Sequence, residues 1–322
     1  MLEISRRIPD LVAYFPRLLS NTFRLRKSIR QQSIAIVHVN DVYNMLGLSL
    51  KLFAGVKVVT HIRRMPESFP SAVYRTWVFL HTRYADRIMP VSKANKSAFP
   101  DNDKIEVVYD PLPDAEQRPS YVPRPQLDKY ASLLYLANYI DGKGHLHALK
   151  MLTLARKRMP DWSFTLRFHG GNLGMEKHDA YRDSLIRYAE AQGLSHCVEF
   201  LGPTSAVEEV MKAHDVVLNL SDSESFSRVT LEALFYGLPT LATDVGGTRE
   251  MVIDGKTGIL APAKDVEAMY DGLHKILRDD ELRVRLSTNA YTFVRNEFGW
   301  EHSVAPILRA YQELSSFSPR SV

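Results

Sequence analysis

The chain has little cysteine and no long apolar run. Its 322 residues include one cysteine, Cys197, which excludes an internal disulfide framework and indicates a reducing compartment. No run approaches the ~18 to 20 apolar residues that span a bilayer, and the first thirty residues have no continuous apolar core of the signal-peptide kind. We therefore expect a cytoplasmic protein.

Charge is divided unevenly along the chain. Residues 1–125 hold 19 Lys and Arg against 11 Asp and Glu, although the net charge of the whole chain is only +4. A basic first half suggests contact with something anionic, such as a lipid surface or a phosphate-linked acceptor, but simple solubility explains such a bias equally well. Because basic and aromatic residues are not interleaved as in a nucleic-acid module, we expect no nucleic-acid partner.

An amphipathic, basic helix is predicted near the start of the chain, and Pro16 should kink or divide it. Two interpretations remain open: the helix packs on a sheet, or it lies peripherally on an anionic membrane. The apolar positions at helical spacing are Ile8, Leu11, Val12, Phe15, Leu19 and Phe23, and the basic residues around them are Arg7, Arg17, Arg24, Arg26, Lys27 and Arg30.

The length suits two α/β domains, because short apolar segments alternate with helical ones in both halves. Residues 110–125 hold five prolines in 16 positions and are predicted to be a linker. We predict domains at 1–118 and 119–300, with a last helix in 301–322. The expected strands are 34–39, 56–60, 87–91, 105–109, 133–137, 164–168, 198–201, 216–220, 240–243 and 258–260, and the expected late helices are 266–277, 281–296 and 300–314.

The most informative stretch runs from Asp215 to Gly258. An apolar strand is followed by the acidic loop Ser221-Asp-Ser-Glu-Ser225, and a helix is predicted from near Ser227 to Gly237. The unpaired N–H groups and the positive dipole end at such a helix start attract phosphates. This stretch therefore predicts a site for a phosphorylated ligand.

A longer string carries a family resemblance. Glu224-Ser-Phe-Ser-Arg-Val-Thr-Leu-Glu232-Ala-Leu-Phe-Tyr-Gly237-Leu-Pro239 resembles the donor-site signature of retaining GT-B glycosyltransferases, family 4 or glycosyl transferases group 1. The resemblance continues in order from Leu133 to Tyr311. It implies an α/β fold of two Rossmann-like parallel-sheet domains facing a cleft, with the last helix, in 301–322, crossing back to the N-terminal domain. Relatives open with a strand and a Gly-rich loop, whereas this chain opens on a helix, so its N-terminal domain is expected to be incomplete.

The resemblance also implies roles for particular residues. Lys143 should meet the donor diphosphate, Glu224 the hydroxyls of the transferred sugar, and Glu232 the ribose hydroxyls, because ammonium groups suit phosphates and carboxylates suit diols. His61, at a predicted strand end, joins Lys143 and Glu224 as a catalytic candidate. Further donor-binding candidates are Asn138, Gly144, Gly170, Phe200, Phe226, Ser227, Arg228 and Val229, and the acceptor-side candidates are His38, Asn40 and Arg63.

The chain departs from the family pattern at several positions. Ala137-Asn138 replaces a common Gly-Arg, so one diphosphate cation is absent unless Arg228 or an N-terminal arginine substitutes. Ser225 and Ser227 replace common glycines. Asp222-Ser-Glu224 is similar to an acidic metal triplet, but the pattern assigns its glutamate to the sugar. We therefore expect no metal and no cofactor besides the nucleotide-sugar co-substrate.

The expected function is a retaining hexosyltransferase that moves a sugar from a UDP- or GDP-sugar to a glycan or lipid-linked acceptor of a cell-surface polysaccharide. The family shows no consistent carboxylate nucleophile, so a same-face displacement is expected, with Glu224 as a positioning residue. Two alternatives remain: an inactive GT-B nucleotide-binding or partner protein, and a sugar-nucleotide epimerase of related architecture.

Overall fold

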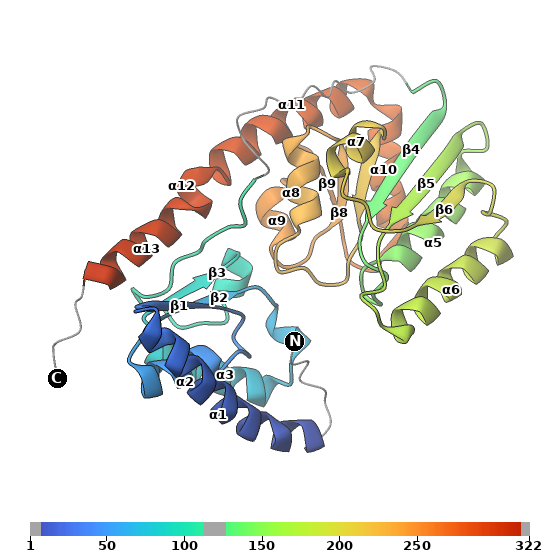
Figure 1. Cartoon of the computed structure of the whole chain (residues 1–322). Coiled ribbons are helices and arrows are strands. Elements are labelled where there is room, and N and C mark those ends of the chain that lie inside the picture. Colours follow the sequence, from blue (N-terminus) through green and yellow to red (C-terminus); the bar gives the residue numbers. More distant parts are fainter. Residues whose placement is uncertain (1–7, 113–126, 317–322) are drawn as a thin grey trace. The chain divides into compact units, whose positions relative to one another are not determined.

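The computed structural model describes residues 8–112 and 127–316, and the chain divides into two compact units. The first comprises Met1–Tyr109 with Glu301–Val322, and the second comprises Asp110–Trp300. Each unit is a parallel sheet with helices packed on it (Figure 1). The domain boundary predicted at residue 118 lies outside the described residues.

The first unit is built on a three-stranded sheet of order β1-β2-β3, in which His38 of β1 lies opposite Val59 of β2. Successive side chains of a strand point to opposite faces, so each face needs its own cover. The elements of this unit are β1 (Ile36–Asn40), β2 (Lys57–Ile62), β3 (Arg87–Pro90), α1 (Ile8–Gln31), α2 (Leu46–Ala54), η1 (Pro66–Ser68), α3 (Ser71–Tyr84), α4 (Lys93–Lys96) and α13 (Ala305–Ser316).

Both faces of this sheet are covered. On one face, Val58 and Ile62 are buried with Leu50 of α2 and Tyr74 of α3. On the other face, the buried neighbours of Val59 and Met89 include Ala310 and Leu314, which come from the C-terminal helix α13. Residues from both ends of the chain therefore complete one small domain.

Pro16 does not divide the first helix, so that part of the prediction is wrong. Helix α1 runs unbroken through this proline. A proline inside a helix removes one backbone hydrogen bond, and the packing of the rest of the helix on α2 offsets that cost. In that packing the hydroxyls of Thr22 and Ser49 lie 2.7 Å apart, and Ile29 joins the buried core.

The predicted strand at 105–109 is also wrong, and a proline explains it. Ile105 forms only an isolated bridge with Ile88. The backbone N–H of Ile88 donates to Lys104, and that of Glu106 donates to Ile88. Pro90 has no N–H to donate to the carbonyl of Glu106, although its own carbonyl accepts from the N–H of Val108, so the ladder is interrupted and no continuous strand forms.

The last predicted helix, 300–314, is interrupted. The structure has α12 (Trp300–Ser303) and α13, separated at Val304. Pro306 has no N–H to donate to the carbonyl of His302, four residues earlier. That carbonyl accepts a 3.1 Å hydrogen bond from the backbone of Tyr109 instead.

The second unit is a six-stranded parallel sheet of order β6-β5-β4-β7-β8-β9. All six strands predicted for this half are present, with ends shifted by a few residues at most. The strands are β4 (Tyr130–Leu136), β5 (Ser163–His169), β6 (Val198–Leu201), β7 (Val216–Asn219), β8 (Thr240–Thr243) and β9 (Ile259–Ala261), and the helices are α5 (His145–Arg158), α6 (Glu176–Ala191), α7 (Val207–Lys212), α8 (Arg228–Phe235), α9 (Thr248–Met251), α10 (Val266–Arg278) and α11 (Asp280–Glu297).

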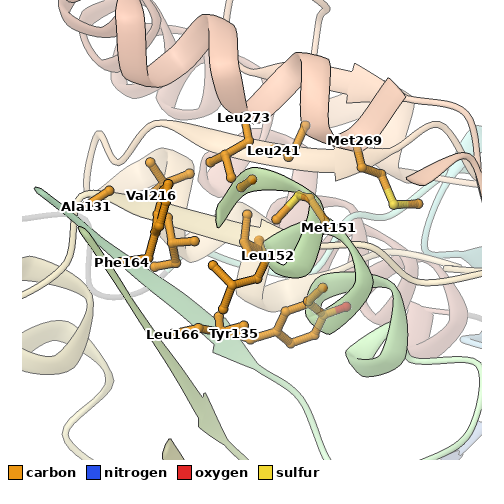
Figure 2. Close-up of a cluster of buried hydrophobic side chains, with 14 of the residues drawn as sticks. Ala131, Tyr135, Met151, Leu152, Phe164, Leu166, Val216, Leu241, Met269 and Leu273 are labelled. Carbon is orange, nitrogen blue, oxygen red and sulfur yellow. The ribbon is translucent and has the colours of Figure 1, made fainter. Parts of the chain in front are cut away.

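A single apolar cluster holds one face of this sheet to its helices (Figure 2). Phe164 and Val216 project from the strands toward Leu152 of α5, and Leu273 and Met269 of α10 complete the cluster. On the unit's other side, α8 contacts β7, β8 and α11. This core fixes the strand ends from which the loops of the candidate site emerge.

Across residues 8–112 and 127–316, no helix combines the length and the apolar character needed to cross a membrane.

Candidate functional site

The strand order of the second unit defines where a ligand would bind. From β4, the strands β5 and β6 are added toward one edge of the sheet. The strands β7, β8 and β9 are added toward the other edge, so the strand order reverses between β4 and β7. In open α/β sheets, ligands bind beyond the carboxyl ends of the strands at such a switch point. The loops that follow β4 and β7 carry Lys143 and Glu224, respectively.

Lys143 and Glu224 are in direct contact. The Lys143 ammonium donates a 2.7 Å hydrogen bond to Oε1 of Glu224, and the Ser221 hydroxyl donates to the same oxygen at 2.9 Å. The Glu224 side chain is mostly buried, at 12% exposed, whereas Lys143 is 34% exposed. The contact therefore orients Glu224 through one carboxylate oxygen.

Helix α8 begins directly after this loop. Ser227 caps it, accepting hydrogen bonds from the backbone N–H and the hydroxyl of Thr230. The N–H groups of Arg228 and Val229 lie in the first turn, where a helix offers no acceptor, so they are available to an anion. The helix ends at Phe235 with Tyr236 as its C-cap, and Gly237, with φ of 74°, is the left-handed residue predicted to follow it.

The β4 loop is held against the β7 loop by backbone contacts. Tyr135, buried in β4, donates a 2.5 Å hydrogen bond to the carbonyl of Lys143 and accepts one from the N–H of Leu220. Gly144 lies at the contact point with φ of 78°, and a Cβ there would sit 2.1 Å from the carbonyl oxygen of Leu220. Only glycine fits this position, so Gly144 acts by allowing the two loops to meet.

At Gly170, too, only glycine fits, because the backbone of another loop lies close to it. A Cβ on Gly170, which follows β5, would lie 1.9 Å from the carbonyl oxygen of Ala137. The exposed side chain of Asn138 accepts a 3.0 Å hydrogen bond from the N–H of Gly171. Asn138 thus ties the β4 and β5 loops together.

Glu232 lies on α8 with its side chain 16% exposed. Burial raises the pKa of Glu232, and the nearby Arg228 guanidinium, 3.2 Å away, lowers it in part. Arg228 itself is 66% exposed. A carboxylate held in this way is an acceptor for hydroxyl groups and is costly to leave without a partner.

The carboxylates of the acidic triplet already have basic neighbours. Asp222 lies 2.9 Å from Nε2 of His147 and 3.9 Å from the ammonium of Lys264, and Glu224 is bound by Lys143. In the part of the chain that the structure describes, no group of three His, Cys, Asp or Glu side chains is arranged to hold a metal ion.

Two aromatic candidates point into the protein. Phe226 is buried and its ring packs 5.7 Å from that of Phe298. Phe200 stacks on Phe168 at 5.2 Å, next to Tyr139. The Phe226 side chain anchors its loop, so a ligand contact made by Phe226 involves the backbone, whereas the ring of Phe200 is only half-buried.

In the first unit, two of the predicted histidines are stacked. The rings of His38 and His61 lie 5.5 Å apart, and Nδ1 of His38 is 2.6 Å from the hydroxyl of Tyr311. Burial lowers the pKa of both histidines, and that of His61 falls to about 3 with the help of the Arg63 charge. Both imidazoles are neutral at physiological pH. An open groove beside them is lined by Ile36, His38, Leu308, Tyr311, Gln312 and Ser315.

Asn40 and Arg63 lie at the ends of β1 and β2, with Asn40 exposed. Between them, the buried carboxylate of Asp41 accepts hydrogen bonds from the N–H groups of Val42 and Arg63. Burial raises the pKa of Asp41 despite the nearby charge of Arg64. Asp41 therefore organises this strand end, and the sequence analysis did not single it out.

The second unit thus brings together Lys143, Glu224 and the start of α8, and it places Glu232 on the same helix. Sequence reasoning missed three supporting residues: Tyr135, His147 and Ser221. A tyrosine in an otherwise apolar strand was a usable signal, because a buried hydroxyl requires a partner. No sequence pattern predicts the pairing of His147 with Asp222, because the two residues are 75 positions apart.

Two parallel-sheet units of this kind define the class of protein: the fold is that of the GT-B glycosyltransferases. Similar solved structures include HepE of Anabaena in complex with UDP and glucose, with a TM-score of 0.76 and 19% identity over 94% of this chain and 80% of that one. Sucrose-phosphate synthase of Thermosynechococcus elongatus gives the same TM-score at 18% identity, over 94% of this chain and 79% of that one.

The chain belongs to the family of glycosyl transferases group 1, whose model matches residues 120–293. Among curated relatives, the D-inositol 3-phosphate glycosyltransferase of Corynebacterium jeikeium is 33% identical over 174 residues, which are 53% of this chain and 41% of that protein. The protein of the same description from Nocardia farcinica is 36% identical over 131 residues, 40% of this chain and 29% of that one. The matched stretch spans less than half of either relative.

Proposed function

We propose that this protein is a retaining hexosyltransferase. It takes the sugar from a UDP- or GDP-sugar and passes it to a glycan or lipid-linked acceptor in the synthesis of a cell-surface polysaccharide. The observation that carries the proposal is the contact between Lys143 and Glu224 beside the start of α8, at the switch point of a group 1 domain.

The donor is held through its charges and hydroxyls. Lys143 and the N–H groups at the start of α8, from Phe226 to Val229, bind the diphosphate, because preorganised donors stabilise the charge that develops on a leaving group. Glu232 accepts hydrogen bonds from the ribose hydroxyls, and Glu224 accepts them from the sugar. Arg228 is the second cation in place of the arginine that Asn138 replaces. The remaining donor contacts are made by Asn138, Gly144, Gly170, Phe200 and Ser227.

The transfer is a same-face displacement. The acceptor oxygen bonds to the anomeric carbon as the bond from that carbon to the diphosphate oxygen breaks, and the acceptor proton passes to a phosphate oxygen. Glu224 positions the sugar and forms no covalent intermediate. Mass spectrometry of the enzyme incubated with a fluorinated donor should therefore find no sugar bound to Glu224.

The acceptor is assigned to the first unit. His61, neutral because its pKa is about 3, serves as a hydrogen-bonding group for the reacting sugars, and His38, Asn40 and Arg63 are the other contacts. The family match begins at residue 120, so the choice of acceptor is inferred from this unit's own residues.

A uridine donor is supported by the HepE structures, which contain UDP, glucose or UDP-glucose. The relatives described as D-inositol 3-phosphate glycosyltransferases support sugar transfer in general. We place the reaction in the cytoplasm, at the inner face of the membrane.

Calorimetric titration of UDP, GDP, ADP and CMP tests the donor site directly. We expect one nucleotide to bind selectively and Glu232→Gln to weaken it at least tenfold, with Glu190→Gln as the control because that carboxylate is exposed and distant from α8 in the sequence. Binding of no nucleotide by the wild-type chain would contradict the donor assignment. Binding without transfer from the matching sugar nucleotide would favour the inactive GT-B alternative.

No metal is assigned to the reaction. The pairing of Asp222 with His147 and of Glu224 with Lys143 supports this, because both carboxylates have a basic partner within 3 Å. Turnover should be unchanged after dialysis against EDTA, and a loss that Mg²⁺ or Mn²⁺ restores would contradict it.

A further inference from the structure

We propose that His147 and Asp222 form a positioning pair for the donor site: the histidine holds the acidic loop in the shape that places Glu224 beside Lys143. This inference rests on the proposed function, because it assigns a supporting role at the same site. Neither His147 nor Asp222 touches the donor in this role. His147 lies in the first turn of α5, and Asp222 lies in the loop between β7 and α8.

Asp222 joins the two loops that carry the charged residues of the site. Its backbone N–H donates a 2.9 Å hydrogen bond to the carbonyl of Gly142, and its Oδ1 lies 2.9 Å from Nε2 of His147. Gly142 immediately precedes Lys143, and Asp222 is two residues before Glu224. A displacement of Asp222 would therefore disturb both sides of the contact between Lys143 and Glu224.

His147 is attached to a well-packed helix. Leu149 and Leu152 of α5 are fully buried and belong to the apolar cluster of this unit (Figure 2). Residues 220–227, by contrast, form neither helix nor strand. A side chain on a packed helix can orient a loop residue precisely, so α5 supplies the fixed point and Asp222 is the group that is held.

The ring of His147 is oriented by its contact with Asp222. A carboxylate only accepts hydrogen bonds, so Nε2 of His147 carries the hydrogen that Asp222 receives. Within residues 8–112 and 127–316, Nδ1 of this ring is buried and has no hydrogen-bond partner. Because Nε2 is engaged and Nδ1 is closed to solvent, the imidazole supports the loop and does not act on the donor.

Lys264 is the weaker partner of Asp222. Its ammonium lies 3.9 Å from Oδ2 of Asp222, and its side chain is 70% exposed. The His147 side chain is closer, at 2.9 Å, and only 18% exposed. Ion pairs that are exposed to water contribute little, because solvent and salt screen them. Removal of the His147 side chain should therefore release Asp222, even though Lys264 remains.

Calorimetric titration of UDP or GDP, whichever the wild type binds, tests the pair. His147→Leu removes the N–H and Asp222→Ala removes the carboxylate, and each should weaken binding by about tenfold. The double variant should weaken it no further, because both changes break one interaction. His147→Gln keeps an N–H donor and should restore most of the affinity. A pair that only stabilised the fold would leave the affinity of the folded protein unchanged.

Hydrogen exchange measured by mass spectrometry tests the pair without any nucleotide. In His147→Leu and in Asp222→Ala, peptides covering residues 139–144 and 220–227 should exchange about tenfold faster than in the wild type, and peptides of α11 should not change. Asp222→Ala alters a partly exposed loop side chain, so it keeps the test available if His147→Leu does not fold. If the wild type binds no nucleotide, the proposed function fails, and the exchange result still decides whether the pair holds the two loops.

The matched controls are His196→Leu and Asp183→Ala, because both side chains are exposed in the second unit. Both controls should bind nucleotide and exchange hydrogen like the wild type. Losses that multiply in the double variant, no recovery in His147→Gln, or equal losses in the controls overturn the proposal. Unchanged exchange of the two loops in both single variants overturns it as well.

Discussion

The ammonium of Lys143 lies 2.7 Å from a carboxylate oxygen of Glu224, although 81 residues separate the two in the chain. The same carboxylate oxygen accepts from Ser221, and the Glu224 backbone carbonyl accepts from the N–H of Gly247. Glu224 is therefore held at three points before any ligand binds. In the proposed donor site, a diphosphate would meet a lysine already positioned by its carboxylate partner.

Replacing Lys143 should weaken nucleotide binding more than it affects folding. For Lys143→Gln we expect UDP or GDP affinity, whichever the wild type prefers, to fall by about 10- to 100-fold, because a hydrogen bond between charged groups contributes about 1.5–3 kcal/mol. Calorimetry measures this. Lys150→Gln, an exposed lysine of α5, is the control and should bind normally. Equal affinities in all three proteins would remove Lys143 from the site.

The glycines of the β4 loop offer a matched pair. Gly142 and Gly144 both have positive φ, 84° and 78°, but only Gly144 has backbone atoms where a Cβ would go. Gly142→Ala should cost about 1–2 kcal/mol from backbone conformation alone. Gly144→Ala should cost clearly more, because the contact with Leu220 must open. Urea unfolding measures both, and similar losses in the two variants would show that the close approach is unimportant.

The buried Glu232, proposed to bind the ribose hydroxyls, should lower the stability of the free protein at neutral pH. Burial raises its pKa, so the native state binds a proton more readily than the unfolded state does. Stability attributable to this group is thus greatest at low pH and is lost as the pH rises through the native pKa. Glu232→Gln should raise the thermal midpoint at pH 7 but not at pH 4. A lower midpoint at pH 7 would show that the pairing with Arg228 outweighs burial.

His61 should make the first unit sensitive to acid. Its native pKa of about 3 lies below the unfolded value of 6.5, so between these values protons bind to the unfolded state alone. Stability is complete above pH 6.5 and falls toward pH 3, by up to about 1.4 kcal/mol per pH unit for one group. His61→Asn should flatten this dependence in urea unfolding at pH 7 and pH 5. The exposed His302 supplies the control His302→Asn, and an equal effect there would contradict the prediction.

The spacing of apolar residues, together with helix caps and turn residues, determined the strands and helices of the second unit. The central strands β4 and β7 are almost entirely buried and so appear in the sequence as short apolar runs. Ser227 and Gly237 mark the ends of α8, because a cap and a left-handed residue are needed there. The Glu224 to Pro239 string likewise identified the family that the match at residues 120–293 shows.

Two local failures have the same cause. Pro90 and Pro306 each lack a backbone N–H. Each therefore leaves one carbonyl without the hydrogen bond that regular structure would give it: the carbonyl of Glu106 beside β3, and the carbonyl of His302 in α12. The sequence shows the prolines, but the identity of the carbonyl left without a donor depends on packing.

Tertiary structure alone decided which side chains meet. Lys143 reaches Glu224 and His147 reaches Asp222 because β4 and β7 are neighbours in the sheet, an order that the sequence does not contain. The same applies to the exposed face of α1, since burial of Ile29 and exposure of Phe23 depend on where α2 packs. Local propensities specify the elements, whereas contacts between residues distant in the chain arise only when the sheet and its helices bury their apolar surfaces together.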